Sequence, residues 1–333
     1  MTGSPETLNL PRYAPGMRGG HYESFFVRAN HPDRPLAFWI RYTVFSPRAA
    51  PEETIGELWA VWFDGERGQH SAAKAELPID QCAFTRDRLD VRIGAASLTA
   101  EELHGSIVTT GRTVAWTLRM ESSGAPLLLL PERLYRARLP RAKSIVGRPD
   151  VRFHGFFAVG SEEFEIDGWR GSQNHNWGSR HTDQYAWGQV VGFDTHSAGV
   201  LEVATARIRL GPVLLPSMTL LVLRLGDIEY RLNTIAHALR SHANVEGFHW
   251  SFSSETDEMQ MAGTISAPRN AFVGLRYANP PGGVKHCLNT KIASCELRIT
   301  DKSSNITEVL ATSNRAAFEI LTDRRDHGIE IRA

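Results

Sequence analysis

Residues 112–120 read Arg-Thr-Val-Ala-Trp-Thr-Leu-Arg-Met, and this stretch indicates the fold. Its larger apolar side chains fall on every second position, and small or polar residues lie between them. Such alternation is typical of a β-strand between a core and water, because successive side chains of a strand face opposite sides. Leu89–Ile93 repeats the pattern, and Phe25 to about Met120 shows hardly any helical period. The chain is therefore predicted to be all-β.

Two further segments are apolar on both faces, namely Phe38–Phe45 and Glu57–Phe63. Strands covered on both sides belong in the wall of a barrel whose interior is filled or holds a ligand. After a Pro- and Arg-rich stretch, 126–149, which we interpret as a connector, strand-like segments continue to about residue 300. We predict two consecutive antiparallel β-barrels with few short helices.

At 333 residues, the chain has a length that suits two domains of ordinary size. We predict a flexible N-terminal tail over residues 1–18, a first barrel over 19–165 and a second over 166–333. Lys plus Arg and Asp plus Glu both number 37, so the formal net charge is zero. No long block of one sign is present to attract nucleic acid or an anionic membrane, so no nucleic-acid partner is predicted.

The most apolar run, Val213–Leu225, contains Pro216 and Arg224 and is shorter than the roughly 20 residues of a membrane-spanning helix. No transmembrane segment is therefore predicted. The first 20 residues lack the apolar core of a secretory signal, and the three cysteines show no disulfide or zinc spacing. These features predict a cytoplasmic protein and leave the oligomeric state open.

The most unusual composition lies in residues 167–189, which hold three of the eight tryptophans together with His, Asn and Gln. Glycines at 168, 171, 178 and 188 permit special backbone conformations or the close approach of another group. Such a stretch either forms a buried, hydrogen-bonded plug between two domains or lines a binding site. Both interpretations remain open from the residues alone.

Imidazole titrates near neutrality, so His175 is the candidate acid–base group. Asn176 or Asn174 would orient it or a water molecule, and Asp167 is a further candidate acid. Aromatic side chains would wall a pocket for a flat or polyunsaturated ligand and stabilise a developing carbocation. The candidate substrate-binding residues are Glu23, Trp169, Trp177, His181, Tyr185, Trp187 and Gln189. The histidine spacing matches no familiar ligand set, so neither a metal nor a cofactor is predicted.

The segment from Gly171 to Gly178 ends in His-Asn-Trp-Gly and is followed by His181 and by Tyr-Ala-Trp-Gly-Gln at 185–189. These residues resemble the signature of the AttH-like and carotenoid 1,2-hydratase (hydroxyneurosporene synthase) family. The resemblance covers most of the chain from about residue 20. Its other matching stretches are His21–Phe26, Leu36–Tyr42, Gly56–Trp59 and Asn289–Ala293.

The resemblance implies a pair of lipocalin-like (calycin-like) β-barrels, in agreement with the strand pattern. The family includes carotenoid hydratases, relatives that resemble tocopherol cyclases and fungal pericyclic enzymes, and many uncharacterised bacterial members, so the fold does not fix the chemistry. The hydratase-like branch carries an acidic residue directly before His-Asn-Trp-Gly, where this chain has Asn174. Because an amide cannot protonate an alkene, Asp167, Asp183 or protonated His175 would have to supply the proton.

Our leading hypothesis is a cofactor-independent enzyme that hydrates, cyclises or isomerises a hydrophobic polyene, isoprenoid or polyketide-like substrate. His175 would transfer the proton. The rival hypothesis is a non-catalytic carrier for a lipophilic small molecule, which needs an apolar cavity but no acid. A third is a structural role in which the tryptophans and histidines only lock the two barrels together.

Overall fold

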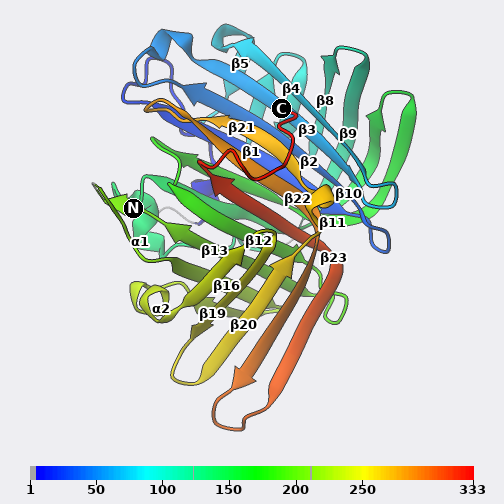
Figure 1. Cartoon of the computed structure of the whole chain (residues 1–333). Coiled ribbons are helices and arrows are strands. Elements are labelled where there is room, and N and C mark those ends of the chain that lie inside the picture. Colours follow the sequence, from blue (N-terminus) through cyan, green and yellow to red (C-terminus); the bar gives the residue numbers. More distant parts are fainter. Residues whose placement is uncertain (1–4, 123, 211) are drawn as a thin grey trace.

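The computed structural model describes residues 5–122, 124–210 and 212–333. These residues form 23 β-strands and two short α-helices, α1 (Glu132–Arg136) and α2 (Ile235–Arg240). Single 3₁₀ turns lie at Pro5–Asn9, Pro51–Glu53, Ile79–Gln81 and Arg269–Ala271. The predicted all-β class and pair of lipocalin-like barrels are confirmed (Figure 1).

Eleven antiparallel strands build the first barrel, in the order β4-β3-β2-β1-β11-β10-β9-β8-β7-β6-β5. The sheet curls until β4 contacts β8. The strands are β1 (His21–Asn30), β2 (Leu36–Ser46), β3 (Ile55–Asp64), β4 (Gln69–Pro78), β5 (Cys82–Phe84), β6 (Asp90–Ile93), β7 (Ala96–Thr99), β8 (Glu102–Thr109), β9 (Arg112–Ser122), β10 (Ala142–Val159) and β11 (Glu162–Gly178).

The second barrel follows the order β17-β16-β13-β12-β23-β22-β20-β19-β18, with β21 paired to β22. It curls until β16 contacts β18 and β19. Its strands are β12 (Gln184–Val191), β13 (Gly199–Arg207), β16 (Met218–Leu225), β17 (Ile228–Leu232), β18 (His242–Glu246), β19 (His249–Glu255), β20 (Met259–Ser266), β21 (Val273–Ala278), β22 (Val284–Asp301) and β23 (Thr307–Thr322). A small hairpin of β14 (Arg209–Leu210) and β15 (Val213–Leu214) lies beside it.

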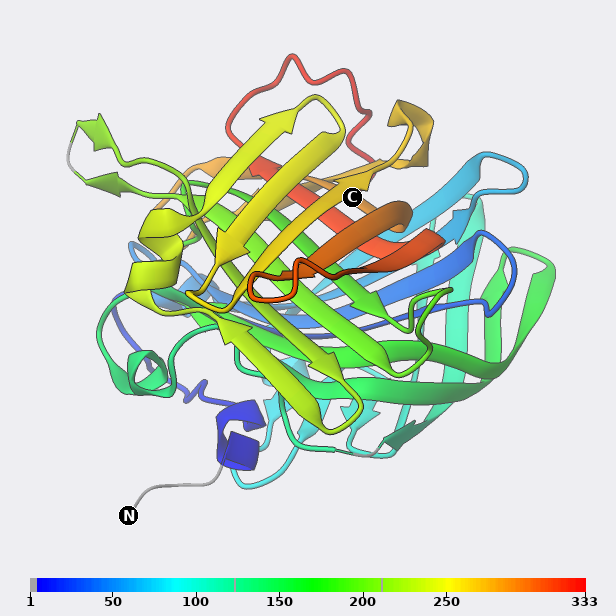
Figure 2. The same cartoon turned by 90° about the horizontal axis from the view of Figure 1, so that it is seen from below.

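Side chains fill the interior of each barrel. In the first, Phe38, Trp62 and Trp169 belong to one aromatic core, and in the second, Trp250 and Phe318 do the same. A third apolar cluster, which includes residues of β1, β2, β3, β12, β21, β22 and β23, lies where the barrels meet back to back (Figure 2). This arrangement explains why the segments Phe38–Phe45 and Glu57–Phe63 are apolar on both faces. One face of each strand fills the first barrel, and the other packs against the second barrel.

The chain passes from the first sheet to the second between Gly178 and Gln184. The predicted division between residues 165 and 166 falls inside β11, which pairs with β10 along its length and with β1 from Arg170 to Gly178. We propose that the domain boundary lies at this later crossing. The Pro- and Arg-rich stretch 126–149, interpreted as a connector, lies within the first barrel. Residues 126–141 belong to the connection from β9 to β10 through α1, whereas residues 142–149 already belong to β10.

Part of the N-terminal stretch that was predicted to be a flexible tail packs against the first barrel. Asn9 and Tyr13 are buried, and Asn9 donates a hydrogen bond to Gln173 at 2.7 Å. The segment is held by hydrogen bonds, because the buried carboxyl of Glu23 accepts from its backbone N–H groups. Composition alone does not show such a partner.

Two glycines of β11 are required by the close approach of neighbouring strands. A Cβ on Gly171 would lie 1.8 Å from the Arg28 carbonyl oxygen, and one on Gly178 would lie 2.2 Å from the Arg141 carbonyl oxygen. No side chain fits there. The polar segment that ends in His-Asn-Trp-Gly is therefore a continuous strand at the centre of the first sheet. Within the described residues, no helix combines the length and apolar character needed to cross a membrane.

Candidate active site

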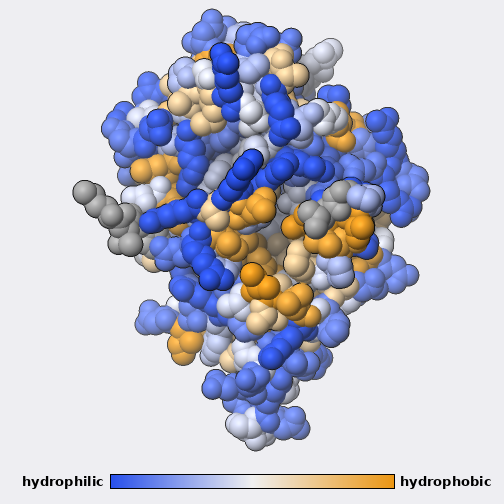
Figure 3. Space-filling model, turned by 90° about the vertical axis from the view of Figure 1, so that its left-hand side faces the viewer, coloured by the Kyte–Doolittle hydropathy of each residue, from blue (hydrophilic) through white to orange (hydrophobic). Residues whose placement is uncertain are grey.

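A cavity of about 320 Å³ lies between the barrels, at the end of their contact that is flanked by α1 and α2. The face that carries these helices is hollowed near its centre, with apolar side chains around the hollow (Figure 3). The volume suits a small organic ligand. Polar groups from both barrels line the cavity, namely Tyr22, Arg41, Asn176, His181, Tyr185, Glu202, Tyr277 and Glu319, together with apolar residues such as Phe26, Ile145, Trp187 and Leu220.

Glu202 on β13 is a buried carboxyl in the wall of this cavity. Trp187 Nε1 donates to its Oε1 at 2.7 Å, and Gln189 Nε2 donates to its Oε2 at 3.0 Å. Burial raises the pKa of Glu202 to about 8, because it outweighs the opposing hydrogen bonds and the charge of Arg28. Glu202 is therefore largely protonated at neutral pH, which is the state that a general acid requires.

Glu319 on β23 is the second carboxyl of the cavity wall, and β12 separates it from Glu202. Lys291 Nζ donates to Glu319 Oε1 at 2.7 Å, and the Tyr185 hydroxyl donates to Oε2 at 3.4 Å. Burial lowers the pKa of Lys291, and Glu319 opposes this shift. Neighbouring strands lie about 4.8 Å apart, so the β13 and β23 backbones are roughly 10 Å apart. Trp187 on β12 lies between them, since its indole donates to Glu202 and lies 5.3 Å from Lys291 Nζ, so the two carboxyls flank this tryptophan in the cavity wall.

Aromatic rings and one guanidinium form another part of the wall. The ring centroids of Tyr22 and His181 lie 4.0 Å apart, and the Arg41 guanidinium lies 4.4 Å from the centroid of the Tyr277 ring. Burial raises the pKa of Tyr185 and Tyr277 well above the usual value, so both hydroxyls remain protonated. The wall thus offers ring faces for a flat ligand and hydroxyl groups for its polar end.

Asn176 supplies a polar group without a protein partner. Its Oδ1 is buried and has no hydrogen-bond partner among the described residues. An unpaired buried acceptor costs about 1–3 kcal/mol, so such atoms are usually satisfied by another molecule. Because Asn176 lines the cavity, its amide oxygen suits a hydroxyl group of a ligand.

His175, the predicted acid–base residue, has a completely buried side chain on the other side of β11 from Asn176. Its Nε2 lies 2.9 Å from Glu23 Oε1, and its Nδ1 lies 3.2 Å from the Leu8 carbonyl oxygen. Burial lowers the pKa of His175 to about 4, although Glu23 acts in the opposite direction. Both ring nitrogens face acceptor groups of the protein, so the imidazole is not free to bind a substrate.

Glu23 joins the N-terminal segment to the first barrel rather than to the cavity. Its fully buried carboxylate accepts from the backbone N–H groups of Arg12 and Tyr13 at 2.8–2.9 Å. Burial alone would raise the pKa of Glu23, but the hydrogen bonds and charges of His175 and His21 hold it well below its usual value. Such a set of donors favours an ionised, structural carboxylate.

The other predicted site residues fall into three groups. His181, Tyr185 and Trp187 line the cavity, as do the consecutive residues Asn174, His175 and Asn176. Trp169 belongs to the core of the first barrel, and Trp177 packs under the Arg12 guanidinium, which lies 3.6 Å from its ring centroid. Asp167 projects from β11 with 84% of its side chain exposed, where it pairs with His154. The structure does not bring Asp167 to His175 or to the cavity.

Gln189 lies behind the cavity wall and connects the two barrels. Its Oε1 accepts from Arg28 Nε at 2.8 Å and from the Ser172 hydroxyl at 2.7 Å, while its Nε2 donates to Asn174 Oδ1 at 2.8 Å. Asn174, which stands where the resembled family's hydratase branch has an acid, is thus a hydrogen-bonding link. The segment 167–189 was interpreted as either a buried, hydrogen-bonded plug or the lining of a binding site. Both occur, because part of the segment forms the buried hydrogen-bond network and part lines the cavity.

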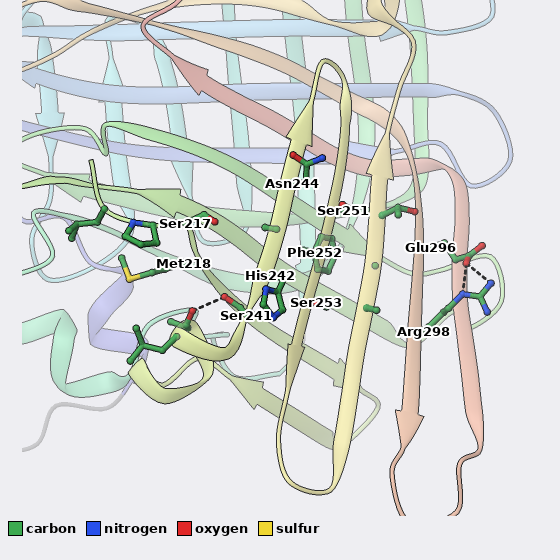
Figure 4. Close-up of a pocket in the computed structure, with 18 residues that line it drawn as sticks. Ser217, Met218, Ser241, His242, Asn244, Ser251, Phe252, Ser253, Glu296 and Arg298 are labelled. Atoms are coloured by element: carbon green, nitrogen blue, oxygen red, sulfur yellow. Dashed lines mark hydrogen bonds and ion pairs between the residues drawn. The ribbon is translucent and has the colours of Figure 1, made fainter. Parts of the chain in front are cut away.

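A larger, more open groove of about 970 Å³ runs along the second barrel beside α2 (Figure 4). Small polar side chains such as Asn244, Ser251 and Ser253 line it. Its charged pair, Glu296 and Arg298, is about half exposed and joined at 2.9 Å. Because this pair is solvated, the groove lacks the buried acid that distinguishes the cavity among the described residues.

Comparisons with known proteins support the architecture. The chain is similar in structure to an AttH candidate from Nitrosomonas europaea, with a TM-score of 0.58, 13% identity, and coverage of 94% of this chain and 99% of that one. It is also similar to kievitone hydratase from Nectria haematococca, with a TM-score of 0.56, 10% identity and coverage of 97% and 96%. These likenesses establish the fold.

In sequence, the chain is 24% identical over 295 residues to uncharacterized proteins of Mycobacterium tuberculosis strains CDC 1551 and H37Rv. The match covers 87% of this chain and 84% of each relative. No protein-family model matches the chain.

Sequence reasoning missed Glu202, Glu319 and Arg41. Glu202 had a signal, since it is a single acidic residue between Leu201 and Val203 in a strand that is otherwise apolar. A charged residue that interrupts such a strand is either exposed or held by buried polar partners. The partner of Glu319, Lys291, lies in the Asn289–Ala293 stretch that carried part of the family resemblance.

Proposed function

We propose that the cavity is the active site of a cofactor-independent, hydratase-type enzyme. Its substrate would be a lipophilic molecule with a carbon–carbon double bond, of the polyene, isoprenoid or polyketide-like class. The observation that carries this proposal is the buried carboxyl of Glu202 in the wall of a largely apolar cavity, where burial raises its pKa to about 8. The shared fold of kievitone hydratase, whose name states a hydration reaction, adds support.

In the forward direction, the Glu202 carboxyl donates its proton to one alkene carbon. The π electrons form the new C–H bond, and the other carbon becomes cationic. The ring faces of Trp187 and Tyr185 stabilise this charge, because aromatic faces attract cations. General acid catalysis of this kind contributes typically about 10²- to 10⁴-fold in rate.

Water then attacks the cationic carbon and forms the C–O bond. The Glu319 carboxylate, which is paired with Lys291, accepts the proton that this water loses. Proton transfer from Glu319 back to Glu202 through solvent completes the cycle, so that the net reaction is addition of water to the alkene. The reverse sequence is dehydration.

His175 has a different role in this proposal from the one predicted from sequence. It positions Glu23 and the N-terminal segment, and it transfers no proton. Asn176 binds a substrate hydroxyl through its unpaired amide oxygen. Gln189 orients Glu202.

The test is incubation of the full chain with prenylated aromatics, linear isoprenoids and polyketide alkenes in isotopically labelled water. We expect at least one substrate to gain one labelled water, as measured by mass spectrometry. Native mass spectrometry of freshly purified protein provides the decisive contrast. A single retained, unmodified lipid with no conversion of any alkene would contradict an enzyme and indicate a carrier.

A further inference from the structure

The entrance of the cavity lies in a surface that is unusually apolar. Leu139, Ile235 and Leu239 are 62%, 60% and 74% exposed. Ile235 itself lines the cavity, and the other two directly adjoin the lining residues Pro140 and Ala238. Val213, 58% exposed, lies on the β14–β15 hairpin that projects on the same side as α2 (Figure 2). Exposed apolar side chains that gather around one opening mark an interaction surface.

The same surface is basic. Although the sequence shows no long uninterrupted block of one charge, residues 131–143 hold five basic side chains and one acidic side chain, which gives 5 − 1 = +4 in a chain whose net charge is zero. Arg133, Arg136, Arg138 and Arg141 are all exposed. Strongly hydrophilic side chains accompany the apolar ones around the hollow (Figure 3). Together, these four arginines with Leu139, Val213, Ile235 and Leu239 are called the docking face.

We propose that the docking face binds an anionic lipid bilayer, and that substrate passes from the bilayer into the cavity without crossing water. The pattern matches the two requirements of peripheral membrane binding, since apolar side chains enter the headgroup region and basic side chains attract anionic lipid. Each basic residue near such a surface strengthens binding about fivefold. The identity of the cargo rests on the proposed function, whereas the binding itself does not.

Nucleic acid is the other polyanion that a basic cluster attracts. The exposed leucine and isoleucine side chains favour a bilayer, because aliphatic groups gain little from a phosphate backbone but gain from contact with acyl chains. The apolar side chains also lie at the cavity entrance, so contact with a bilayer would place the acyl-chain region next to the opening. A basic patch elsewhere on the surface would not do this.

The test is flotation of the full chain with vesicles of phosphatidylcholine alone or mixed with phosphatidylglycerol. We expect binding to the mixed vesicles that weakens as salt increases, and little binding to neutral vesicles. Arg138→Gln should weaken binding about fivefold, and Leu139→Ser or Leu239→Ser should weaken it several-fold. Arg67→Gln and Ile306→Ser, at exposed positions in turns away from the docking face, are matched controls that should bind normally.

Absence of flotation with mixed vesicles, or equal losses in the control variants, would overturn the proposal. Binding to an RNA oligonucleotide without binding to vesicles would also overturn it and assign the basic cluster to a polynucleotide. The proposal of membrane binding and the proposal of hydratase activity can be tested independently. Glu202→Gln should float like the unmodified protein, and Leu239→Ser should convert detergent-dispersed substrate at the normal rate.

Discussion

Two buried glutamates in this protein have opposite protonation states. Glu23 lies at the end of the first barrel among two histidines and two backbone N–H groups, and its pKa is held well below the usual value. Glu202 lies in the cavity between the barrels, with a tryptophan and a glutamine as its donors, and burial raises its pKa to about 8. Both are almost fully inaccessible to solvent.

The difference shows that partners, rather than burial, decide what a buried carboxyl can do. Ionisable and backbone donors favour the charged form of Glu23, which makes it a fixed structural link. Two neutral donors do not outweigh the burial of Glu202, which remains protonated and faces a space that admits a ligand. Perturbed groups in cavities are candidate catalytic residues, whereas similar groups in sealed networks usually serve packing. Replacing glutamate with glutamine at position 202 and at position 23 therefore distinguishes a catalytic from a structural carboxyl.

Glu202→Gln should produce the largest effect. The amide keeps the size of the side chain but has no acidic proton to donate, so we expect kcat to fall about 10³-fold. Steady-state turnover of the substrate identified by labelled water is the measurement, and Glu296→Gln in the solvated pair of the outer groove is the control. A Glu202→Gln protein that retains full kcat would exclude this residue as the acid.

Glu23→Gln should instead destabilise the fold. An amide NH₂ would face one of the N–H donors of Arg12 and Tyr13, and these buried donors would lose a carboxylate acceptor. Leaving a buried donor without a partner costs about 1–3 kcal/mol. Denaturant unfolding followed by tryptophan fluorescence measures this cost. An unchanged midpoint would show that the N-terminal segment docks without Glu23.

The pH dependence of stability should have opposite signs for the two residues. The folded pKa of Glu202 exceeds its usual value of 4.5, so its contribution is complete below pH 4.5 and is lost as the pH rises toward about 8. The folded pKa of Glu23 lies below 4.5, so its contribution is present above pH 4.5 and is lost on acidification.

Unfolding free energies measured from pH 2 to 9 test this contrast. Relative to Glu202→Gln, the unmodified protein should lose roughly 5 kcal/mol between the two ends of the Glu202 range. Relative to Glu23→Gln, its advantage should shrink below pH 4.5. Parallel curves for all three proteins would mean that neither carboxyl has a shifted pKa.

Much of the fold could be predicted from sequence because period-two alternation reports directly which side of a strand is buried. The strand at 112–120 appears as β9, with Val114, Trp116 and Leu118 in the core. The crossing between barrels was harder to place. β11 is polar on the face toward the second barrel, so its composition resembles a loop or plug although its backbone is a central strand.

The site was only partly predictable. His181, Tyr185 and Trp187 follow Gly178 closely in sequence and share the cavity wall. His175 and Asn176 both belong to the cavity lining, but successive side chains of a strand face opposite sides. The ring nitrogens of His175 therefore face Leu8 and Glu23, whereas Asn176 offers an unpaired amide oxygen. Glu202 lies on β13, the strand that directly follows and pairs with β12. Glu319 comes from a strand far along the chain, and its approach to Tyr185 and Trp187 depends on the pairing of β12 with β23, which no local pattern reveals.

Asp167→Asn should have the smallest effect, although Asp167 was a candidate acid in the sequence. Its carboxylate is largely exposed and pairs only with a partly exposed His154 at 3.1 Å, and solvated pairs of this kind contribute little. We expect unchanged kcat, an unchanged pH profile and an unchanged thermal midpoint. A loss of turnover comparable to that of Glu202→Gln would place the proton donor on the outer face of β11. Because that face is remote from the cavity, such a result would break the contrast between a sealed and a cavity-facing carboxyl.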